Sequence, residues 1–251
     1  MAVDPSSPFT GGALLGDRVR MTAHSADPGV YIRSVGSRGG LGGLGKSTGD
    51  MRYALEAYGC DVILLETVGV GQSELDVMLV ADTVVLVLTP GAGDHVQTAK
   101  AGIMEIADVF TVNKRELPGA DALLREVRQM LHERLLPHSD WLSPVVAVSA
   151  AQGAGLDELW QAIVQHGSYL KDQGLWQRKQ QVRHQRETLR LIEEEFRRYL
   201  EHRVQADESW QHAVRGSKGF NPYLAADIIR QDLSFLSGSS AGNSGKKENP
   251  I

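Results

Sequence analysis

The residues best suited to chemistry follow short apolar runs of the chain. Glu66 and Gly69 come after the run 62–65. An acidic side chain at the end of a buried strand can hold Mg²⁺, directly or through water, and a nearby glycine amide can meet a terminal phosphate. The segment Glu66-Thr67-Val68-Gly69 also fits an ordinary strand end followed by a turn, so both interpretations are open for this group alone.

A second group, Asn113-Lys114-Arg115-Glu116, follows the apolar run 109–112 and resembles the Asn-Lys-x-Asp motif that recognises guanine. In that motif the asparagine orients the loop, the lysine stem lies along the base, and the carboxylate accepts two guanine N–H hydrogens. Glu116 stands where the motif has aspartate, so its carboxylate is displaced by one methylene group. A displaced acceptor weakens the hydrogen bonds that it makes, and we therefore expect a weakened preference for guanine.

Ser149 and Ala150 follow a third apolar run, 145–148, and resemble the loop in which G proteins use a backbone N–H to contact guanine O6. Two residues carry little weight alone, but three such groups in this order predict a nucleotide site. Ligands of parallel α/β sheets bind beyond the carboxyl ends of the strands, where all three groups would lie. The nucleotide-binding residues that we expect are Glu66, Gly69, Asn113, Lys114, Glu116, Ser149 and Ala150.

The elements that must position these groups alternate between strand and helix patterns. Strand-like apolar runs occupy residues 30–35, 62–65, 83–88, 109–112 and 145–148. Unbroken apolar strands indicate burial on both faces. Helical spacing of apolar residues follows within 123–135 and again within 156–163. Together these patterns predict an α/β fold of three layers, with a mostly parallel sheet between helices.

The character of the sequence changes after Tyr169. Residues 176–204 are rich in Gln, Arg and Glu, contain no Pro or Gly, and carry a narrow apolar stripe at Leu189, Ile192, Phe196, Tyr199 and Leu200. A narrow stripe on a long charged helix is typical of packing against another helix. We expect an α/β domain over 1–170, a helical dimerisation arm over 171–236 and a disordered tail over 237–251.

Bulk composition argues against several classes of protein. The chain has 251 residues, and its net charge of −5 gives no reason to expect a nucleic acid or a membrane as partner. No stretch approaches the ~20 apolar residues of a membrane span. The single cysteine, Cys60, cannot form an internal disulfide, so the cytoplasm is the expected compartment. The eight histidines are scattered without ligand spacing, and we expect them at the surface.

Longer segments are similar to one family, the MeaB/ArgK G-protein chaperones of adenosylcobalamin-dependent acyl-CoA mutases. The segments that carry this resemblance are Asp4-Pro5-Ser6-Ser7-Pro8, Gly16–Met21, Ile32–Ser34, Glu66–Glu74, Pro90–Asp94 and Lys100–Asp108. The resemblance implies a homodimeric P-loop GTPase that binds GTP or GDP with Mg²⁺ and serves methylmalonyl-CoA mutase or a related mutase. It also makes Asp4 and Glu66 candidate Mg²⁺ ligands, although Asp4 fits a capping role equally well.

The family's phosphate-binding loop, Gly-x-x-x-x-Gly-Lys-Ser/Thr, precedes the segment that resembles Asp4–Pro8. The resemblance therefore implies a core without its first βα unit and slow GTP hydrolysis by the chain as given. A look-alike of the loop has Gly40, Gly45, Lys46 and Ser47 at the pattern positions. It follows a strand-like run and precedes a helical one, as a phosphate loop must. It also falls where the family has another Gly-rich segment, and we favour that second interpretation.

The leading functional hypothesis is a GTP-binding and GTP-hydrolysing chaperone that assists adenosylcobalamin loading and protection of the mutase. One alternative is a non-hydrolysing remnant that acts only as a dimeric mutase-binding protein. Another is a kinase linked to basic amino-acid transport. We assign no catalytic residue from the sequence.

Overall fold

A computed structural model describes residues 2–4, 24, 26–36, 46–67, 77–91, 103–133, 140–215 and 221–233, with the backbone alone for 2–4, 35–36, 46–47, 78 and 103–104. The chain forms two compact units, Met1–Arg183 and His184–Ile251. Their division falls inside one helix, α8 (Leu175–Ala206). The expected tail over 237–251 lies outside the described residues.

The strands of the first unit form two three-stranded sheets. One sheet has the order β2 (Ser34–Gly36), β1 (Ala2–Asp4), β3 (Glu66–Thr67), and the other has the order β4 (Val85–Leu88), β5 (Val109–Val112), β6 (Val145–Ala147). Every pairing within both sheets is parallel. The α/β class and the parallel strands predicted from the sequence are therefore confirmed, with the described strands divided between two sheets.

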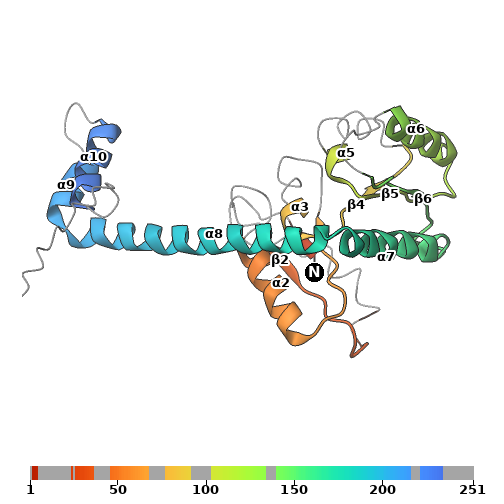
Figure 1. Cartoon of the computed structure of the whole chain (residues 1–251), viewed down its shortest axis with the longest axis horizontal. Coiled ribbons are helices and arrows are strands. Elements are labelled where there is room, and N and C mark those ends of the chain that lie inside the picture. The colour runs from red at the N-terminus through yellow and green to blue at the C-terminus, as the bar shows by residue number, and fades with distance from the viewer. Residues whose placement is uncertain are drawn as a thin grey trace, which may run out of the picture. The chain divides into compact units, whose positions relative to one another are not determined.

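Helices cover both faces of the second sheet. In Figure 1, α6 (Ala120–Glu133) lies on one side of β4, β5 and β6, and α7 (Leu156–Asp172) lies on the other. The remaining helices of this unit are α2 (Lys46–Tyr58), α3 (Val77–Val80) and α5 (Ile103–Ile106). The arrangement gives three layers around β5, as the alternation of strands and helices predicts.

The core of the first unit is built around β5. Val109, Phe110 and Val112 are fully buried, and so is Val127 on the inner face of α6. Leu123 lies one helical turn before Val127 and is also buried, which explains the apolar spacing of this helix. Because α6 and α7 cover opposite faces of the sheet, a strand at its centre is buried at every position. Three of the four residues of β5 are apolar, and the hydroxyl of the fourth, Thr111, donates to Val146 O at 3.0 Å.

Two expected strands are placed differently in the structure. The runs 30–35 and 62–65 were expected to be strands, whereas β2 begins at Ser34 and β3 begins at Glu66. Both positions follow from pairing with β1, because Ala2 lies opposite Ser34 on one side and opposite Glu66 on the other. Residues before Ser34 and Glu66 therefore have no residue of β1 (Ala2–Asp4) opposite them.

The second unit contains the rest of α8, followed by α9 (Glu208–Arg215) and α10 (Pro222–Asp232). Trp210 is buried where α9 meets α10, and its Nε1 donates to Asp232 Oδ2 at 2.9 Å. The Arg203 guanidinium lies 5.1 Å from the centre of the Trp210 ring. Asn221 caps α10, whose first residue is proline, by accepting a hydrogen bond from Tyr223 N. None of the helices in the described part of the chain is long and apolar enough to cross a membrane.

A buried polar cluster joins α7 to the amino ends of the second sheet. His166 on α7 is 2% exposed, and its Nδ1 lies 2.8 Å from Thr83 Oγ1. Its Nε2 lies 3.4 Å from Asp108 Oδ1, and the other carboxylate oxygen of Asp108 accepts from Val84 N at 2.8 Å. Trp141 packs on His166 and donates through Nε1 to Asp108 O. The expectation that all histidines lie at the surface is therefore wrong for His166.

This cluster predicts a loss of stability in mild acid. Burial lowers the pKa of His166, and the nearby Asp108 carboxylate offsets only part of that effect. The unfolded chain then binds a proton near the ordinary value of 6.5 while the folded chain does not. The free energy of unfolding should therefore fall as pH drops below about 6.5 toward the lower folded pKa.

Urea unfolding at pH 7.5 and pH 5.5 measures this effect. A His166→Gln variant should be less stable at pH 7.5 and should lose less stability between the two pH values. His132 is exposed on α6, so His132→Gln should keep the pH dependence of the unaltered chain. Equal pH dependence in His166→Gln and the unaltered chain would contradict this account.

Candidate nucleotide site

Asn113 connects the two loops in which guanine-recognition residues were expected. It directly follows β5, and its backbone N–H donates to Leu88 O of β4 at 2.8 Å. Its side-chain Oδ1 accepts from Lys114 N at 2.8 Å and from Ala150 N at 3.1 Å. One side chain thus holds the loop after β5 against the loop after β6.

Lys114 has an unusual backbone conformation. Its φ of 58° is positive, and it is the one non-glycine residue among those described for which this is recorded. A side chain in this left-handed region costs roughly 1–2 kcal/mol. The conformation is held by Arg115 N donating to Val148 O at 3.0 Å and Leu117 N donating to Lys114 O at 2.9 Å. Backbone strain that is held by surrounding bonds is a common mark of functional loops.

Glu116 presents a charged carboxylate beside this loop. Its pKa is lowered chiefly by the Ser149 hydroxyl, then by its own backbone N–H, with a smaller contribution from the Lys114 ammonium. Ser149 is fully buried, and its Oγ has no formed hydrogen bond among the described residues, so it approaches Glu116 without completing one. The exposed carboxylate is therefore ionised at neutral pH and can accept two N–H hydrogens.

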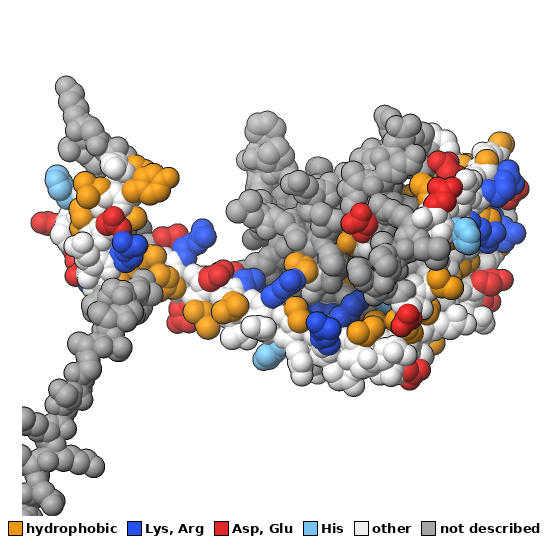
Figure 2. All heavy atoms as spheres, turned by 45° about the horizontal axis from the view of Figure 1, so that its top comes forward, with side chains coloured by type: hydrophobic (Ala, Val, Ile, Leu, Met, Phe, Trp, Pro, Cys, Tyr) orange, Lys and Arg blue, Asp and Glu red, His pale blue; other side chains and the backbone are white. Residues whose placement is uncertain are grey.

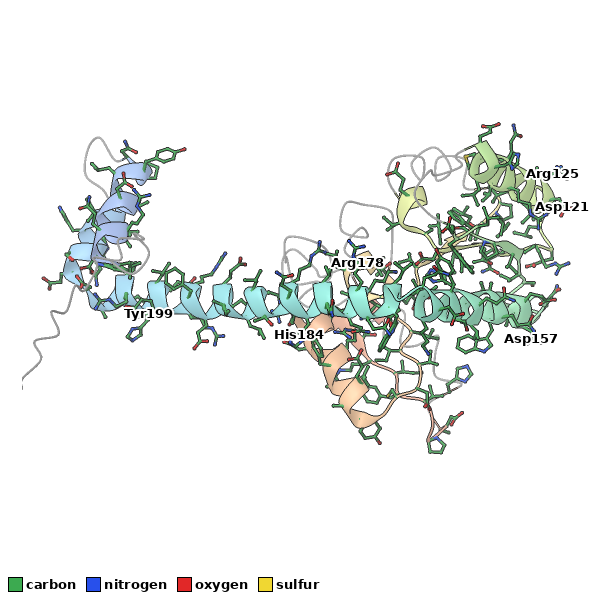
Figure 3. All side chains as sticks on the ribbon, viewed as in Figure 1. Asp121, Arg125, Asp157, Arg178, His184 and Tyr199 are labelled. Atoms are coloured by element: carbon green, nitrogen blue, oxygen red, sulfur yellow. The ribbon has the colours of Figure 1, made fainter. Side chains whose placement is uncertain are left out.

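A tight turn positions Ala150. Ser149 N donates to Ala154 O at 2.8 Å, and Gln152 N donates to Ser149 O at 3.1 Å. Gly155 ends the turn with a φ of 78°, immediately before α7, whose first turn contains Asp157 (Figure 3). A Cβ atom on Gly155 would lie 2.3 Å from Ala147 O, which is closer than real contacts allow.

The candidate Mg²⁺ ligands lie on neighbouring strands of the first sheet. Asp4 is the last residue of β1, and Glu66 is the first of β3, paired with Ala2. Mg²⁺ is usually held by one or two carboxylates together with phosphate oxygens and water. Asp4 lies two residues further along β1 than Ala2, so the two acidic residues are on adjacent strands but not directly opposite each other. The described part of the chain has no group of three or more histidine, cysteine or acidic residues able to hold a metal ion by itself.

Several predicted residues lie partly or wholly outside the described structure. Gly69, Gly40 and Gly45 are among them. The backbone of Lys46 and Ser47 forms the start of α2, so the phosphate-loop look-alike is followed by a helix and preceded by β2. The backbone elements required by the phosphate-loop pattern are therefore present on both sides of it.

Comparison with known families matches residues 1–207 to the family described as methylmalonyl Co-A mutase-associated GTPase MeaB. The chain belongs to the MeaB family. A relative from Pyrococcus abyssi, a GTPase by its name, is 46% identical over 237 residues, covering 93% of this chain and 73% of the relative. GTPase ArgK of Escherichia coli is 39% identical over 188 residues, covering 74% of this chain and 56% of ArgK.

A mammalian relative extends the comparison. The mitochondrial methylmalonic aciduria type A homolog of Mus musculus is 37% identical over 236 residues, covering 91% of this chain and 56% of that protein. Membership of the MeaB family confirms the resemblance on which the expected GTPase core depends. GTP binding and an association with methylmalonyl-CoA mutase are properties of the family as its description gives them.

The structure adds residues that the MeaB motifs did not identify. Leu88 O fixes Asn113 from the neighbouring strand, and Gly155 allows the turn that positions Ala150. The glycine could have been suspected from the segment Gln152-Gly153-Ala154-Gly155, because closely spaced glycines mark tight turns. The Leu88 contact depends on strand order, for which the local sequence carries no signal.

Gly155→Ala should destabilise the chain by at least about 2 kcal/mol, because a side chain there combines an unfavourable φ with a clash against backbone. Gly153→Ala is the matched control, since Gly153 has a φ of 70° but open space where a Cβ atom would lie. The control should cost only the conformational penalty, roughly 1 kcal/mol. Urea unfolding of both variants measures the difference, and equal losses would show that the contact with Ala147 O relaxes freely.

Proposed function

We propose that the chain binds GTP and GDP with Mg²⁺ and acts as a chaperone that assists adenosylcobalamin loading and protection of methylmalonyl-CoA mutase or a related acyl-CoA mutase. The observation that carries the nucleotide part is the pair of hydrogen bonds accepted by Asn113 Oδ1, which joins the two expected guanine loops. The family description and the name of the mouse relative support the mutase part.

Asn113 and Glu116 divide the recognition of guanine between them. Because Asn113 Oδ1 accepts from two backbone amides, its Nδ2 group is the part that can donate to the base. The ionised carboxylate of Glu116 can accept the N1 and N2 hydrogens of guanine, which adenine does not offer in that arrangement. The stem of Lys114 is available to lie along the base.

Ala150 needs a different account from the one expected. A backbone N–H of the loop that contains Ser149 and Ala150 was expected to meet guanine O6, and in the structure the Ala150 N–H donates to Asn113 Oδ1. Contact with O6 therefore requires that the Ala150 N–H be shared between the two oxygens or be released by Asn113. At 3.1 Å this bond is the longer of the two that Asn113 accepts, so it is the more readily exchanged.

Glu66 and Asp4 are the residues that would hold Mg²⁺. The ion would neutralise the charge of the terminal phosphates, and the two carboxylates would bind and orient it from adjacent strands. On this proposal, Gly69 would lie beside the terminal phosphate. The proposal assigns no residue to the hydrolytic step.

The apolar stripe of α8 supports a homodimer. Leu189, Ile192 and Tyr199 are 53%, 58% and 46% exposed, and Phe196 stacks on Tyr199 with ring centres 6.3 Å apart. Figure 3 labels Tyr199 on the surface of α8, and Figure 2 shows hydrophobic side chains exposed among charged ones along this helix. Large apolar side chains gain roughly 1.5–3 kcal/mol each on burial. Packing against the same stripe of a second copy would bury them symmetrically.

Titration calorimetry with GDP and ADP tests the nucleotide proposal. We expect GDP to bind at least tenfold more tightly than ADP and expect Asn113→Ala to remove this preference. Glu116→Asp should tighten GDP binding about fivefold, because the shorter carboxylate restores the geometry of the guanine motif. Glu126→Asp makes the same chemical change at an exposed position of α6 and should leave GDP affinity unchanged.

Two outcomes would count against this assignment. Equal affinities for GDP and ADP in the unaltered chain would exclude guanine recognition by these loops. Weaker GDP binding in Glu116→Asp would show that the loop is built around the longer side chain. The mutase part is tested separately, by co-elution of the chain with a methylmalonyl-CoA mutase in gel filtration with and without GDP. Failure to co-elute under either condition would contradict the chaperone role.

Sedimentation velocity tests the dimer. The unaltered chain should sediment as a dimer at micromolar concentration, and a Leu189→Glu, Phe196→Glu double variant should sediment as a monomer with its helical content retained. Leu191→Glu is the control, because Leu191 is 48% exposed but lies on the opposite side of α8 from Leu189 and Phe196 by helical spacing. A monomeric unaltered chain, or equal disruption by Leu191→Glu, would contradict dimerisation through the stripe.

A further inference from the structure

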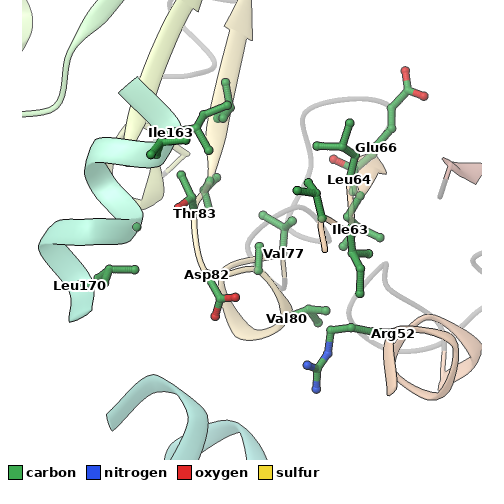
Figure 4. A pocket seen from close by; sticks show the side chains of 18 of the residues that line it. Arg52, Ile63, Leu64, Glu66, Val77, Val80, Asp82, Thr83, Ile163 and Leu170 are labelled. Carbon is green, nitrogen blue, oxygen red and sulfur yellow. The ribbon is translucent and has the colours of Figure 1, made fainter. Parts of the chain in front are cut away.

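The first charged side chains of α8 are engaged with the first unit. Arg183 Nη2 donates to Asp82 Oδ1 at 2.8 Å, and Lys179 Nζ donates to Asp82 O at 2.8 Å. Asp82 lies beside Thr83 in the wall of a cavity of about 1020 Å³ (Figure 4). Arg183 is only 8% exposed, so its contact is closed to solvent. Lys179 and Arg183 are therefore occupied within their own chain.

Further along α8, two opposite charges are left over. Arg190 forms ion pairs with Glu187 and Glu194 of the same helix. Arg186 and Glu193 are exposed, and neither forms an ion pair with another residue that the structure describes. They are seven residues apart, which places them on the same side of α8 but roughly 10 Å apart along its axis. They are too far apart to pair with each other within one helix.

The exposed apolar stripe of α8 has the spacing of a coiled-coil seam. Leu189 and Phe196 are seven residues apart, and Ile192 and Tyr199 are seven residues apart between and after them. The steps alternate between three and four residues, which is the heptad pattern of helices that pack along their length. Glu193 directly follows Ile192 of this seam. It therefore lies on one flank of the stripe.

The two flanks of the stripe differ in charge. Arg186 lies seven residues before Glu193 and shares its flank. The opposite flank carries Thr188 and Glu195, each directly before a seam residue. Charges at flanking positions of a coiled coil determine which partner is chosen and in which orientation. One flank of α8 thus carries a basic and an acidic residue, and the other carries a single charge at the corresponding positions.

This charge pattern distinguishes between the two orientations in which two copies of α8 can pack. In a parallel pair, each flank faces the opposite flank of the other helix, so Arg186 would face Gln181 and Glu193 would face Thr188. Neither contact joins opposite charges. In an antiparallel pair, each flank faces the same flank of the other helix. Arg186 then faces Glu193 of the second copy, and symmetry makes the same contact twice.

We propose that α8 packs antiparallel against α8 of a second copy, with Arg186 of each chain paired to Glu193 of the other. Leu189 of one helix lies against Ile192 of the other, and Gln185 lies against Phe196. The opposite flank brings Glu195 against the uncharged Thr188, so no like charges meet there. This inference rests on the proposed homodimer and adds its orientation, its register and the charges that select a second copy as the partner.

Charge reversal followed by sedimentation equilibrium tests the pairing in the full chain. Arg186→Glu and Glu193→Arg should each weaken the dimer at least tenfold, because each places two pairs of like charges across the seam. An equal mixture of the two variants should sediment as a dimer at a concentration where each alone is a monomer, since every charge then faces its opposite. Recovery in the mixture also shows that both variants are folded. Arg198→Glu makes the same charge change on the side of α8 away from the stripe and should leave the dimer unchanged.

Disulfide trapping measures the orientation independently. Cys60 is the single cysteine, so a Cys60→Ser chain provides a background without thiols. In this background, a mixture of Gln185→Cys and Phe196→Cys chains should form a disulfide-linked dimer under mild oxidation. Gln185→Cys alone should form little, because the two copies of this residue are roughly 16 Å apart along the axis of an antiparallel pair. In a parallel pair they would face each other and form the bond readily.

The outcomes separate this inference from the homodimer on which it rests. A monomeric unaltered chain would contradict the homodimer and the pairing together. A dimer whose affinity is unchanged by both charge reversals, or a mixture of the two variants that stays monomeric, would contradict the antiparallel pairing alone. Efficient disulfide formation by Gln185→Cys alone would assign the parallel orientation and would also overturn the proposal.

Discussion

The burial of β5 is the constraint on which the candidate nucleotide site depends. All four of its residues lie in the interior, between α6 and α7 and between β4 and β6. The strand consequently cannot shift its register without moving apolar side chains into water. Asn113 follows the last of these residues, and its backbone is fixed by Leu88 O. The loop that carries Lys114 and Glu116 therefore begins from a rigid point, and a strained conformation at Lys114 can be maintained there.

The sequence was most informative where structure is determined locally. The run 109–112 is a strand with the predicted bounds, and the apolar spacing after Leu123 lies on a helix. A strand that is buried on both faces shows a continuous, largely apolar run, and a helix that is buried on one face shows apolar residues at helical spacing. Both patterns can therefore be recognised in the local sequence. The loops that follow β5 and β6 lie where the motifs placed them. The sequence predicted a strand over 62–65, whereas β3 begins at Glu66. The start of β3 depends on pairing with β1, which is distant in sequence and begins opposite Glu66.

The parts of the site that could not be predicted depend on contacts between distant side chains and backbone groups. Nothing in the order Ser149-Ala150 indicates that the hydroxyl of the first lowers the pKa of Glu116, or that the amide of the second donates to Asn113. Burial of His166 was likewise hidden, because its partners Thr83 and Asp108 are separated from it by more than fifty residues. The local sequence around a histidine does not show whether it lies at the surface or is enclosed by residues that are distant along the chain.

Tryptophans in both compact units provide intrinsic optical probes, and Trp210 of the second unit is buried. Trp210 is the single tryptophan of residues 184–251, and it lies under the Arg203 guanidinium in a closed environment. Trp141 packs against His166 in the other unit, with ring centres 4.9 Å apart and ring planes tilted by 52°. Opening of the second unit would transfer the Trp210 indole from protein to water and shift its emission to longer wavelength, whereas emission from the first unit comes from Trp141, Trp160 and Trp176 together. The chain thus carries, without any added label, a means to ask whether its two units melt together or in sequence.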